Sequence, residues 1–423
     1  MYGYFAWDTS MENRRIFLKA SVAAAALSRP VLGANERIQM GLIGCGTRGL
    51  MDAGFFGRHE DCVFIAACDV YKTRLDQVVK KLSEGGGKVD AYEDYRRLLD
   101  RKDIDAVLVA TPDHWHSPMT LDACAAGKDV YVEKPVSNTI EAGQKMVDAA
   151  RQYKRVVQVG LQQREGEHFK EAAKLVQDGL LGQVTHAVMQ FSGGYTVPPE
   201  PNQDPPEDLN WDMFQGPAER RLYKPSRQRR WRAYYDYGGG LVTDWGVHLV
   251  DVAHWYLNAD TKAPLLTNAS AQYVNVPNPG HDQVPDAFIV SWQYDKFVMS
   301  FTNAVMTDPD FPLHGNYFYG PRGSLLVHRS GYQVRPGQPR RMPGGAEPPP
   351  PIEAQTVRFR ENYENDPDTI AHARNFLDCV KSRQQPTANI DIGFNSTLPC
   401  LLGILAIRQG RSFTWDGKAA KAV

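Results

Sequence analysis

The chain has 423 residues, of which 42% are hydrophobic and 23% are charged, and this is the composition of an ordinary soluble globular protein. This length exceeds what one hydrophobic core usually organises, so we expect two domains. The formal net charge of −1 lacks the basic excess that drives nucleic-acid binding, so no nucleic-acid partner is expected.

The N-terminal segment has the features of an export signal. Residues 11–28, "MENRRIFLKASVAAAALS", place an Arg-Arg pair before Phe-Leu-Lys and a short Ala-rich stretch, which resembles a twin-arginine signal. The apolar stretch is too short to span a bilayer stably, so no membrane anchor is expected. We therefore assign residues 1–34 to a signal region and expect a periplasmic or secreted protein, the alternative being an ordinary basic amphipathic start.

The six cysteines (45, 62, 68, 124, 379 and 400) form no C-x-x-C pair, and several lie in apolar runs. This pattern favours buried small side chains over disulfides or zinc ligands.

Short apolar runs alternate with helical patterns from residue 37 to residue 160. Alternating strands and helices indicate a parallel, doubly wound sheet, so residues 35–160 are predicted to form a Rossmann dinucleotide-binding domain. The predicted strands are 37–44, 62–69, 104–112, 129–135 and 155–160, and the predicted helices are about 48–57, 72–82, 95–103, 117–127 and 139–153.

The glycine cluster "GCGTRG" (44–49) falls between the first predicted strand and the first helix. There Gly44 permits the turn, Gly46 lets the backbone approach a pyrophosphate, and Gly49 allows close packing of the helix on the strand. The N-terminus of the helix offers free N–H groups to the phosphates. A chance match is the alternative for the motif alone, but its position favours a dinucleotide.

Asp69 lies twenty residues after Gly49, at the end of the second predicted strand. A carboxylate at this position binds the ribose hydroxyls of NAD and repels the 2′-phosphate of NADP. NAD is the predicted cofactor. NADP remains the alternative, because the cations Lys72 and Arg74 lie nearby in the sequence.

The pattern changes after residue 160. Long, often alternating strand-like segments with proline-rich loops at 197–209 and 335–353 predict an open, mainly antiparallel sheet in a C-terminal α/β domain, residues 161–423. The strand-like segments are 184–191, 270–276, 287–294 and 296–304, and closing helices are predicted at 371–382 and 396–410.

Lys134 belongs to "VEKP" (132–135), at the end of the fourth predicted strand. Ligands of doubly wound sheets bind outside the carboxyl ends of the strands, so Lys134 is predicted to lie near the nicotinamide. A lysine there can hold a substrate hydroxyl or polarise a carbonyl, whereas the alternative is a solvated loop lysine.

Asp244 and His248 lie four residues apart in "GGGLVTDWGVHLVD" (238–251). On a helix they share one face, so the carboxylate could orient the imidazole as a general base for a hydroxyl proton. The alternative is a helix-starting aspartate with a hydrogen-bonded core histidine.

Taken together, these motifs resemble the glucose–fructose oxidoreductase/inositol dehydrogenase/MocA family. The landmarks are "GCGTRG", "CDV", "ATPDHWH", "GKDVYVEKP", "GLLGQV", "GGGLVTDWGVHLVD" and "FLDCVKS", spread from about residue 37 to about residue 415. The resemblance implies a Rossmann domain, a C-terminal domain with an open sheet, a tightly held nicotinamide cofactor, polyhydroxylated substrates and a homodimer or homotetramer. It also implies that Lys134, Asp244 and His248 are the catalytic residues, with His248 as the acid/base.

Further residues are expected to border the cleft. Aromatic faces stack on sugar rings, and arginine and tyrosine bond hydroxyls, although ordinary packing is an equal alternative. The predicted cofactor residues are Gly44, Gly46, Thr47, Arg48, Gly49, Asp69, Thr111, Pro112, His116, Glu133 and Lys134. The predicted substrate residues are Lys134, Gln163, Arg164, Trp231, Arg232, Tyr235, Asp244 and His248, with His168 as a further candidate.

The pair His114 and His116 has no third ligand at metal-binding spacing, so no metal is expected. His116 is instead expected to cap the following helix or to border the nicotinamide.

The sequence therefore predicts an exported NAD(P)-dependent oxidoreductase for a sugar or sugar-derived hydroxyl, with its cofactor retained and recycled. The alternative is a redox-assisted glycoside hydrolase or lyase, which oxidises a ring hydroxyl, eliminates the aglycone, adds water and returns the hydride to the sugar. Tyr235, Tyr237 and His168 are candidates for its second base. The related glycosidases that remove N-acetylgalactosamine often lack "EKP", so Lys134 favours the dehydrogenase. A noncatalytic sugar-binding protein is a third hypothesis.

Overall fold

The computed structural model describes residues 37–195, 197–274, 282–303, 314–338, 350–359 and 365–423. Residues Ile38–Val423 form one compact unit. The predicted export signal, residues 1–34, lies outside the described residues.

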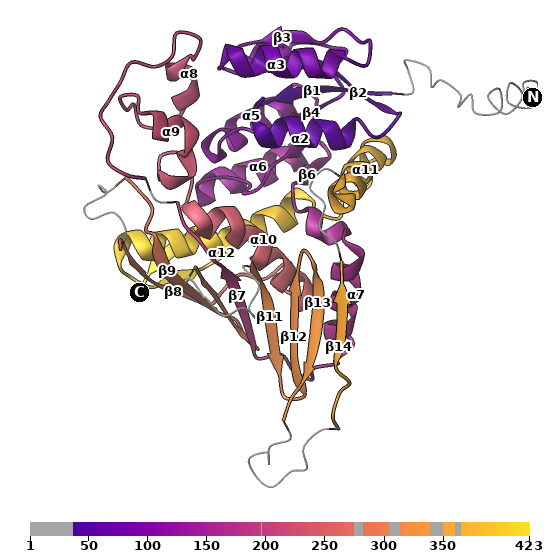
Figure 1. The fold of residues 1–423 in the computed structure, drawn as a ribbon, viewed down its shortest axis with the longest axis vertical. Coiled ribbons are helices and arrows are strands. Elements are labelled where there is room, and N and C mark those ends of the chain that lie inside the picture. Colours follow the sequence, from indigo (N-terminus) through magenta and orange to yellow (C-terminus); the bar gives the residue numbers. More distant parts are fainter. Residues whose placement is uncertain (1–36, 196, 275–281, 304–313, 339–349, 360–364) are drawn as a thin grey trace, which may run out of the picture. The chain divides into compact units, whose positions relative to one another are not determined.

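The first sheet is parallel and doubly wound, which confirms the predicted Rossmann domain. Its strand order is β3-β2-β1-β4-β5-β6, and β4 and β5 are buried along their whole length. The strands are β1 (Ile38–Ile43), β2 (Cys62–Cys68), β3 (Asp90–Tyr92), β4 (Ala106–Val109), β5 (Asp129–Val132) and β6 (Val157–Val159). The helices among them are α2 (Thr47–Phe56), α3 (Lys72–Ser83), α4 (Tyr95–Leu99), α5 (Asp113–Ala125) and α6 (Ile140–Gln152). Figure 1 shows them grouped around this sheet.

Helix α5 begins at Asp113, four residues before the predicted start at Ser117. The prediction took Ser117 and Pro118 as the first turn of a helix, where both residue types are common. In the structure the Ser117 hydroxyl donates instead to the backbone oxygen of Ala142 in α6, at 3.1 Å, and Pro118 lies inside the helix. Residues 113–116 are thereby placed on the helix beside the carboxyl ends of the strands.

The second sheet is mainly antiparallel, as predicted. Its order is β14-β13-β12-β11-β7-β10-β9-β8-β15-β16, and only the pairing of β7 with β10 is parallel among the described strands. The strands are β7 (His186–Phe191), β8 (Leu266–Gln272), β9 (Ala287–Gln293), β10 (Val298–Thr302), β11 (His314–Gly320), β12 (Gly323–His328), β13 (Gly331–Pro336), β14 (Gln355–Arg358), β15 (Phe413–Trp415) and β16 (Ala420–Ala422). Strand β3 and strands β11–β16 were not predicted, since most are short or glycine-bounded.

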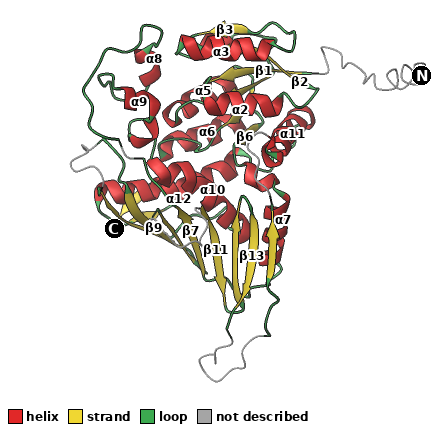
Figure 2. Cartoon of the chain, viewed as in Figure 1, coloured by secondary structure: helices red, strands yellow, loops and turns green. Residues whose placement is uncertain are grey.

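Long helices cover one face of the second sheet (Figure 2). Helix α10 (Gly240–Tyr256) packs on α12 (Ile390–Gln409), and α12 contacts both α6 of the first sheet and β8 of the second. By length and composition α12 is apolar enough to cross a membrane, but 72% of its apolar window is buried inside the protein, as in a core helix. The remaining helices are η2 (Gln162–Glu165), α7 (Glu167–Gln177), α8 (Trp211–Gln215), α9 (Pro225–Arg229), η3 (Trp231–Ala233) and α11 (Pro367–Ser382).

Helix α11 returns the chain to the first sheet. Its Phe376 packs edge-on against Phe56 and Tyr131, with ring centroids 5.8 and 6.0 Å apart. Arg374 donates two hydrogen bonds to Asp61, at 2.7 and 2.9 Å. The C-terminal part of the chain therefore completes the core of the cofactor domain. All six cysteines are buried and free, as predicted.

The packing of α2 on β1 depends on Gly49. A Cβ atom at this position would lie 2.0 Å from the backbone oxygen of Gly44, so Gly49→Ala must displace the glycine turn. We expect a large loss of thermal stability and of bound cofactor. The control is Gly54→Ala in the same helix, where no atom lies within 4 Å; its helix propensity should raise the unfolding free energy by up to about 1 kcal/mol. Similar melting temperatures for the two variants would contradict this account.

Candidate active site

A cavity of about 400 Å³ lies at the carboxyl ends of β1, β2, β4 and β5, where a doubly wound sheet binds ligands. Every predicted cofactor residue except Gly49 lines it, and Gly49 supports the turn from behind. Of the predicted substrate residues, Lys134, Trp231 and Arg232 line it.

The glycine turn is shaped for a close ligand. Gly44 has a φ of +98°, and a Cβ atom there would lie 2.6 Å from the backbone oxygen of Ala110. Helix α2 starts after Gly46 with no side chain capping its N–H groups. Uncapped N–H groups at a helix N-terminus form an anion site, so the turn fits a pyrophosphate.

Asp69 lies at the end of β2 and is held by the backbone. Its two carboxyl oxygens accept hydrogen bonds from the N–H groups of Cys45, at 2.7 Å, and Tyr71, at 2.8 Å. Because the carboxylate is fixed at the cavity wall, it is well placed for ribose hydroxyls. Arg74 also lines this end of the cavity, with its guanidinium 5.4 Å from the Tyr71 ring centroid.

Glu133 of the "EKP" motif turns toward α2. Its Oε1 accepts a hydrogen bond from Nε of Arg48 at 3.0 Å, and Nη2 of Arg48 lies 2.9 Å from Asp52. Burial opposes a charge on Glu133, but Arg48 and Lys134 outweigh it and hold the pKa of Glu133 below its usual value. Burial raises the pKa of Asp52 well above normal, so Glu133 carries the negative charge of this cluster.

The carboxylate of Asp244 is the centre of a polar cluster that includes Lys134 and Arg232 from the cavity lining. Its Oδ1 accepts hydrogen bonds from Nζ of Lys134, at 2.6 Å, and lies 3.1 Å from Nε of Arg232. The Tyr195 hydroxyl donates to Oδ2. Burial opposes the charge, but Arg232 and Lys134 outweigh it, and the pKa of Asp244 lies far below the normal range.

The predicted orientation of His248 by Asp244 is wrong. Both carboxyl oxygens of Asp244 are taken by other segments, and Nδ1 of His248 is buried without a hydrogen-bond partner in the described structure. Burial, together with the Lys134 ammonium, lowers the pKa of His248 well below that of a free imidazole. The ring is therefore neutral, one helical turn beyond Asp244.

His116 does not cap a helix, because it lies inside α5. Its Nδ1 is 2.7 Å from the backbone oxygen of Pro135, and its Nε2 is 2.9 Å from that of Thr111. It borders the cavity, as the other part of the prediction expected. Nε2 of His114 lies 3.0 Å from the backbone oxygen of Phe214. The described residues contain no group of three His, Cys, Asp or Glu side chains that could hold a metal.

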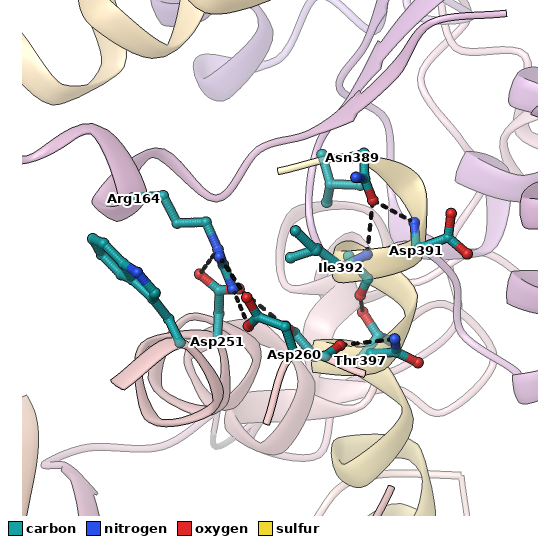
Figure 3. Close-up of polar contacts among 12 residues, drawn as sticks. Arg164, Asp251, Asp260, Asn389, Asp391, Ile392 and Thr397 are labelled. Carbon is teal, nitrogen blue, oxygen red and sulfur yellow. Dashed lines mark hydrogen bonds and ion pairs between the residues drawn. The ribbon is translucent and has the colours of Figure 1, made fainter. Parts of the chain in front are cut away.

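Arg164 is not a cavity residue. Its Nε donates to Asp251 at 2.9 Å, its Nη2 donates to Asp260 at 2.6 Å, and the residue is only 7% exposed (Figure 3). The prediction assumed that residues after the last Rossmann strand border the cleft, whereas this guanidinium joins η2 to α10. Arg164 is therefore a structural ion-pair residue.

Asp244 and His248 do not line the cavity, although Lys134, which binds Asp244, does; four other candidates also lie outside the lining. Gln163 is buried next to Arg164. The His168 ring stacks on Phe359, the Tyr235 ring lies beneath the guanidinium of Arg408, and Tyr237 is fully buried. None of Gln163, His168, Tyr235 and Tyr237 therefore reaches the cavity in this structure.

Sequence reasoning missed the segment that closes the cavity. Residues 208–216, which we call the strap, run along the first domain, and Leu209, Met213 and Phe214 from the strap line the cavity. The strap binds through its backbone: Lys72 N–H donates to the Asp208 oxygen at 2.8 Å, and Nε1 of Trp115 donates to the Phe214 oxygen at 2.9 Å. Because these contacts use backbone atoms, the side chains carry little signal for them.

Comparison with known proteins assigns both domains to one protein family. Residues 38–161 match the model of an oxidoreductase family with an NAD-binding Rossmann fold, and residues 165–326 match the C-terminal alpha/beta domain of the same family. The glycosyl hydrolase family 109 protein 2 of Shewanella sp. (strain ANA-3) is 33% identical over 203 residues, which cover 41% of this chain and 44% of that protein. The alpha-N-acetylgalactosaminidase of Shewanella oneidensis is 30% identical over 156 residues, covering 36% and 34%. The matched region thus spans less than half of these relatives.

Solved structures share the fold. Levoglucosan dehydrogenase, in complex with NADH and levoglucosan, has a TM-score of 0.65 at 18% identity, covering 89% of this chain and 98% of that one. The aldose-aldose oxidoreductase of Caulobacter crescentus has a TM-score of 0.63 at 22% identity, covering 90% and 100%.

We expect Arg164→Met to lower the unfolding free energy by about 3–5 kcal/mol, because it leaves Asp251 buried without its cation. The matched control is Lys174→Met, whose exposed pair with Asp178 is worth about 1 kcal/mol or less. Urea unfolding measures both. If Arg164→Met instead folds with normal stability but binds sugar poorly, Arg164 is a substrate-binding residue, as the sequence predicted.

Proposed function

Because the chain belongs to the glucose–fructose oxidoreductase/inositol dehydrogenase/MocA family of NAD-binding oxidoreductases, we propose that it oxidises a hydroxyl of a sugar or sugar-derived alcohol. The observation that carries this proposal is the Lys134 ammonium, held by the Asp244 carboxylate at the wall of the cofactor cavity.

The cavity fits NAD by its own shape and donor groups. The Gly44–Gly46 turn and the uncapped start of α2 fit the pyrophosphate, and the fixed Asp69 carboxylate fits the ribose. The nicotinamide, when bound, supplies the hydride acceptor. Lys134 and Glu133, which follow β5, and His116 of α5 line the cavity on other elements than Asp69 and Arg74, and these three residues would border the nicotinamide.

The residues around that end can manage the hydroxyl proton. Lys134 binds the substrate oxygen and stabilises negative charge on it, while Asp244 and its backbone oxygen, 2.6 and 3.0 Å from Nζ, keep the ammonium in place. His248 is neutral because burial lowers its pKa, so Nδ1 can accept the proton and readily return it. The Arg232 guanidinium lies 4.2 Å from the centroid of the Trp231 ring. We assign the Trp231 ring to stacking on the sugar.

The strap supports retention of the cofactor between turnovers. Asp208 also accepts hydrogen bonds from the N–H and hydroxyl of Thr73 at the start of α3, and Asn210 donates to Glu93 at 2.6 Å. Leu209, Met213 and Phe214 of the strap would contact a bound dinucleotide, so the strap would slow its release and favour recycling of the cofactor in place. Release of the reduced cofactor at each turnover would contradict this arrangement.

Export and assembly are part of the same proposal. The twin-arginine-like region 1–34 suits transport of a folded protein that already holds its cofactor. Three apolar side chains of the second sheet, Ile289 on β9, Val298 on β10 and Tyr319 on β11, are 40–49% exposed. An apolar sheet face of this kind favours a homodimer or homotetramer.

Redox-assisted glycoside cleavage is the second candidate, favoured by relatives at 30–33% identity that are named glycosyl hydrolases of family 109 and an alpha-N-acetylgalactosaminidase. Oxidation of a ring hydroxyl acidifies the neighbouring C–H; elimination, addition of water and return of the hydride then leave no net redox change. The candidate second bases Tyr235, Tyr237 and His168 lie outside the cavity lining, so this reaction needs another acid–base group.

Lys134→Ala should lower the rate at which sugars reduce the bound cofactor by about 10²–10⁴-fold, because the substrate oxygen loses its cationic partner. The rise of the reduced-nicotinamide absorbance after rapid mixing measures it. Lys174→Ala is the control, because this exposed lysine pairs with Asp178 on the surface of α7. An unchanged rate in Lys134→Ala would remove Lys134 from the mechanism.

Asn210→Ala should speed cofactor loss about fivefold, since the Asn210 side chain caps α8 and such a cap is worth about 1 kcal/mol. Dialysis followed by absorbance of the retained cofactor measures the loss. Asn268→Ala, an exposed position on β8, is the control. Equal retention in both variants would show that the strap does not hold the cofactor.

A further inference from the structure

Asp113 is a buried carboxyl group that lines the cavity without a partner. It is the first residue of α5 and is 2% exposed, and its carboxyl oxygens make no hydrogen bond or ion pair within the described ranges. The other acidic groups at the cavity are engaged: Asp69 by backbone N–H groups, Glu133 by Arg48. An unpaired buried carboxyl group costs stability, so a site that keeps one has a use for it.

The carboxyl group is pressed against the turn before α10. A Cβ atom at Gly238 would lie 3.1 Å from Oδ2 of Asp113 and 3.1 Å from the Trp231 ring, so the carboxyl group and the ring both lie close to this glycine. The side chain is thus held at the cavity wall beside Trp231, which lines the same cavity. This placement puts Asp113 among the groups that meet the sugar.

The charges around Asp113 come from three segments: Arg232 of η3, Asp244 of α10, and Glu133 and Lys134 after β5. Burial is the largest effect and raises the pKa of Asp113 to about 8; Arg232 opposes this rise and Asp244 adds to it. Asp244, in contrast, stays ionised because Arg232 and Lys134 lower its pKa. Two nearby carboxyl groups with oppositely shifted pKa values provide a proton carrier and a permanent anion.

We propose that Asp113 is the acid of this cavity and gives its proton to the glycosidic oxygen that departs when an oxidised glycoside is cleaved. This inference rests on the proposed oxidation by bound NAD and adds a bond-breaking step to it. It identifies the substrate class as glycosides whose aglycone is a poor leaving group, such as an alcohol or another sugar, because these oxygens need a proton to leave.

Hydride passes from a ring carbon to the bound cofactor, and the hydroxyl proton of that carbon passes to a base. These two transfers leave a carbonyl two carbons from the anomeric centre. A base takes the proton from the carbon between them, and the C–H electrons form a C=C bond. The bond from the anomeric carbon to the glycosidic oxygen breaks, and that oxygen takes the Asp113 proton. Water then adds and reprotonates Asp113, and the hydride returns.

The test uses Asp113→Asn in the cofactor-loaded full chain, with methyl and 4-nitrophenyl glycosides of a sugar that reduces the bound cofactor. Asparagine matches the shape of the protonated acid but has no proton to give to the departing oxygen. Methanol release should fall about 10²–10⁴-fold, whereas nitrophenol release should fall less than about tenfold, because nitrophenolate leaves without a proton. Asp113→Glu should restore part of the methanol release.

The pH dependence separates an acid from a merely structural residue. Wild-type methanol release should decline as pH rises through about 8, where Asp113 loses its proton, and Asp113→Asn should lack this decline. A pKa raised by folding means that the wild-type protein loses stability as pH rises from the ordinary aspartate range toward about 8. The melting temperature of Asp113→Asn relative to wild type should therefore rise over that range, which also reports that the variant is folded.

Equal slowing of both leaving groups, or loss of cofactor reduction, would overturn the role of Asp113. Wild-type protein that reduces its cofactor with glycosides but releases no methanol would also overturn it, while leaving the proposed oxidoreductase intact. Failure of every sugar to reduce the bound cofactor would instead overturn the proposed function.

Discussion

The site is built around one buried carboxylate, that of Asp244. It takes up Lys134 from the carboxyl end of β5, Arg232 from η3 and Tyr195 from the segment after β7. Removing one partner from such a buried cluster leaves an uncompensated charge and costs about 3–5 kcal/mol. The carboxylate therefore joins the cofactor domain to α10 and holds the lysine where the two domains meet, so that neither domain alone can assemble the cluster.

The cofactor cavity and the substrate groups are consequently parts of one arrangement. The glycine turn, Asp69, Lys134 and Arg232 line the same cavity, and the strap contributes Leu209, Met213 and Phe214 to the lining. Helix α11 returns from the C-terminal part of the chain to complete the core behind this sheet, where Phe376 contacts Phe56. A retained cofactor, a fixed cation and a neutral imidazole are what repeated oxidation and reduction of a sugar hydroxyl within one site require.

Much of this could be predicted from the sequence, because local patterns determine it. Strand–helix alternation identifies the parallel sheet, and the spacing of Gly44, Gly46, Gly49 and Asp69 locates the cofactor turn. Lys134 could be placed because the carboxyl ends of parallel strands meet at one edge. These inferences need only neighbours in sequence and a known topology.

Partners distant in sequence could not be predicted. The four-residue spacing of Asp244 and His248 gives proximity on a helix, but it does not show that Lys134, Arg232 and Tyr195 occupy the carboxylate first. Arg164 looked like a cleft residue because its partner Asp251 lies 87 positions away. Asp113 was missed because the predicted start of its helix lay four residues late, and the strap because its partners Thr73 and Trp115 lie 135 and 99 positions away in the sequence.

The central claim is that hydride moves directly between a sugar carbon and the cofactor held in this cavity. In the most direct measurement, the cofactor-loaded protein is mixed with a sugar deuterated at its ring carbons. The cofactor is then released by denaturation, and its mass is determined by mass spectrometry. The account predicts that the reduced cofactor, trapped after the oxidation step, carries one deuterium. A reduced cofactor without deuterium would contradict it.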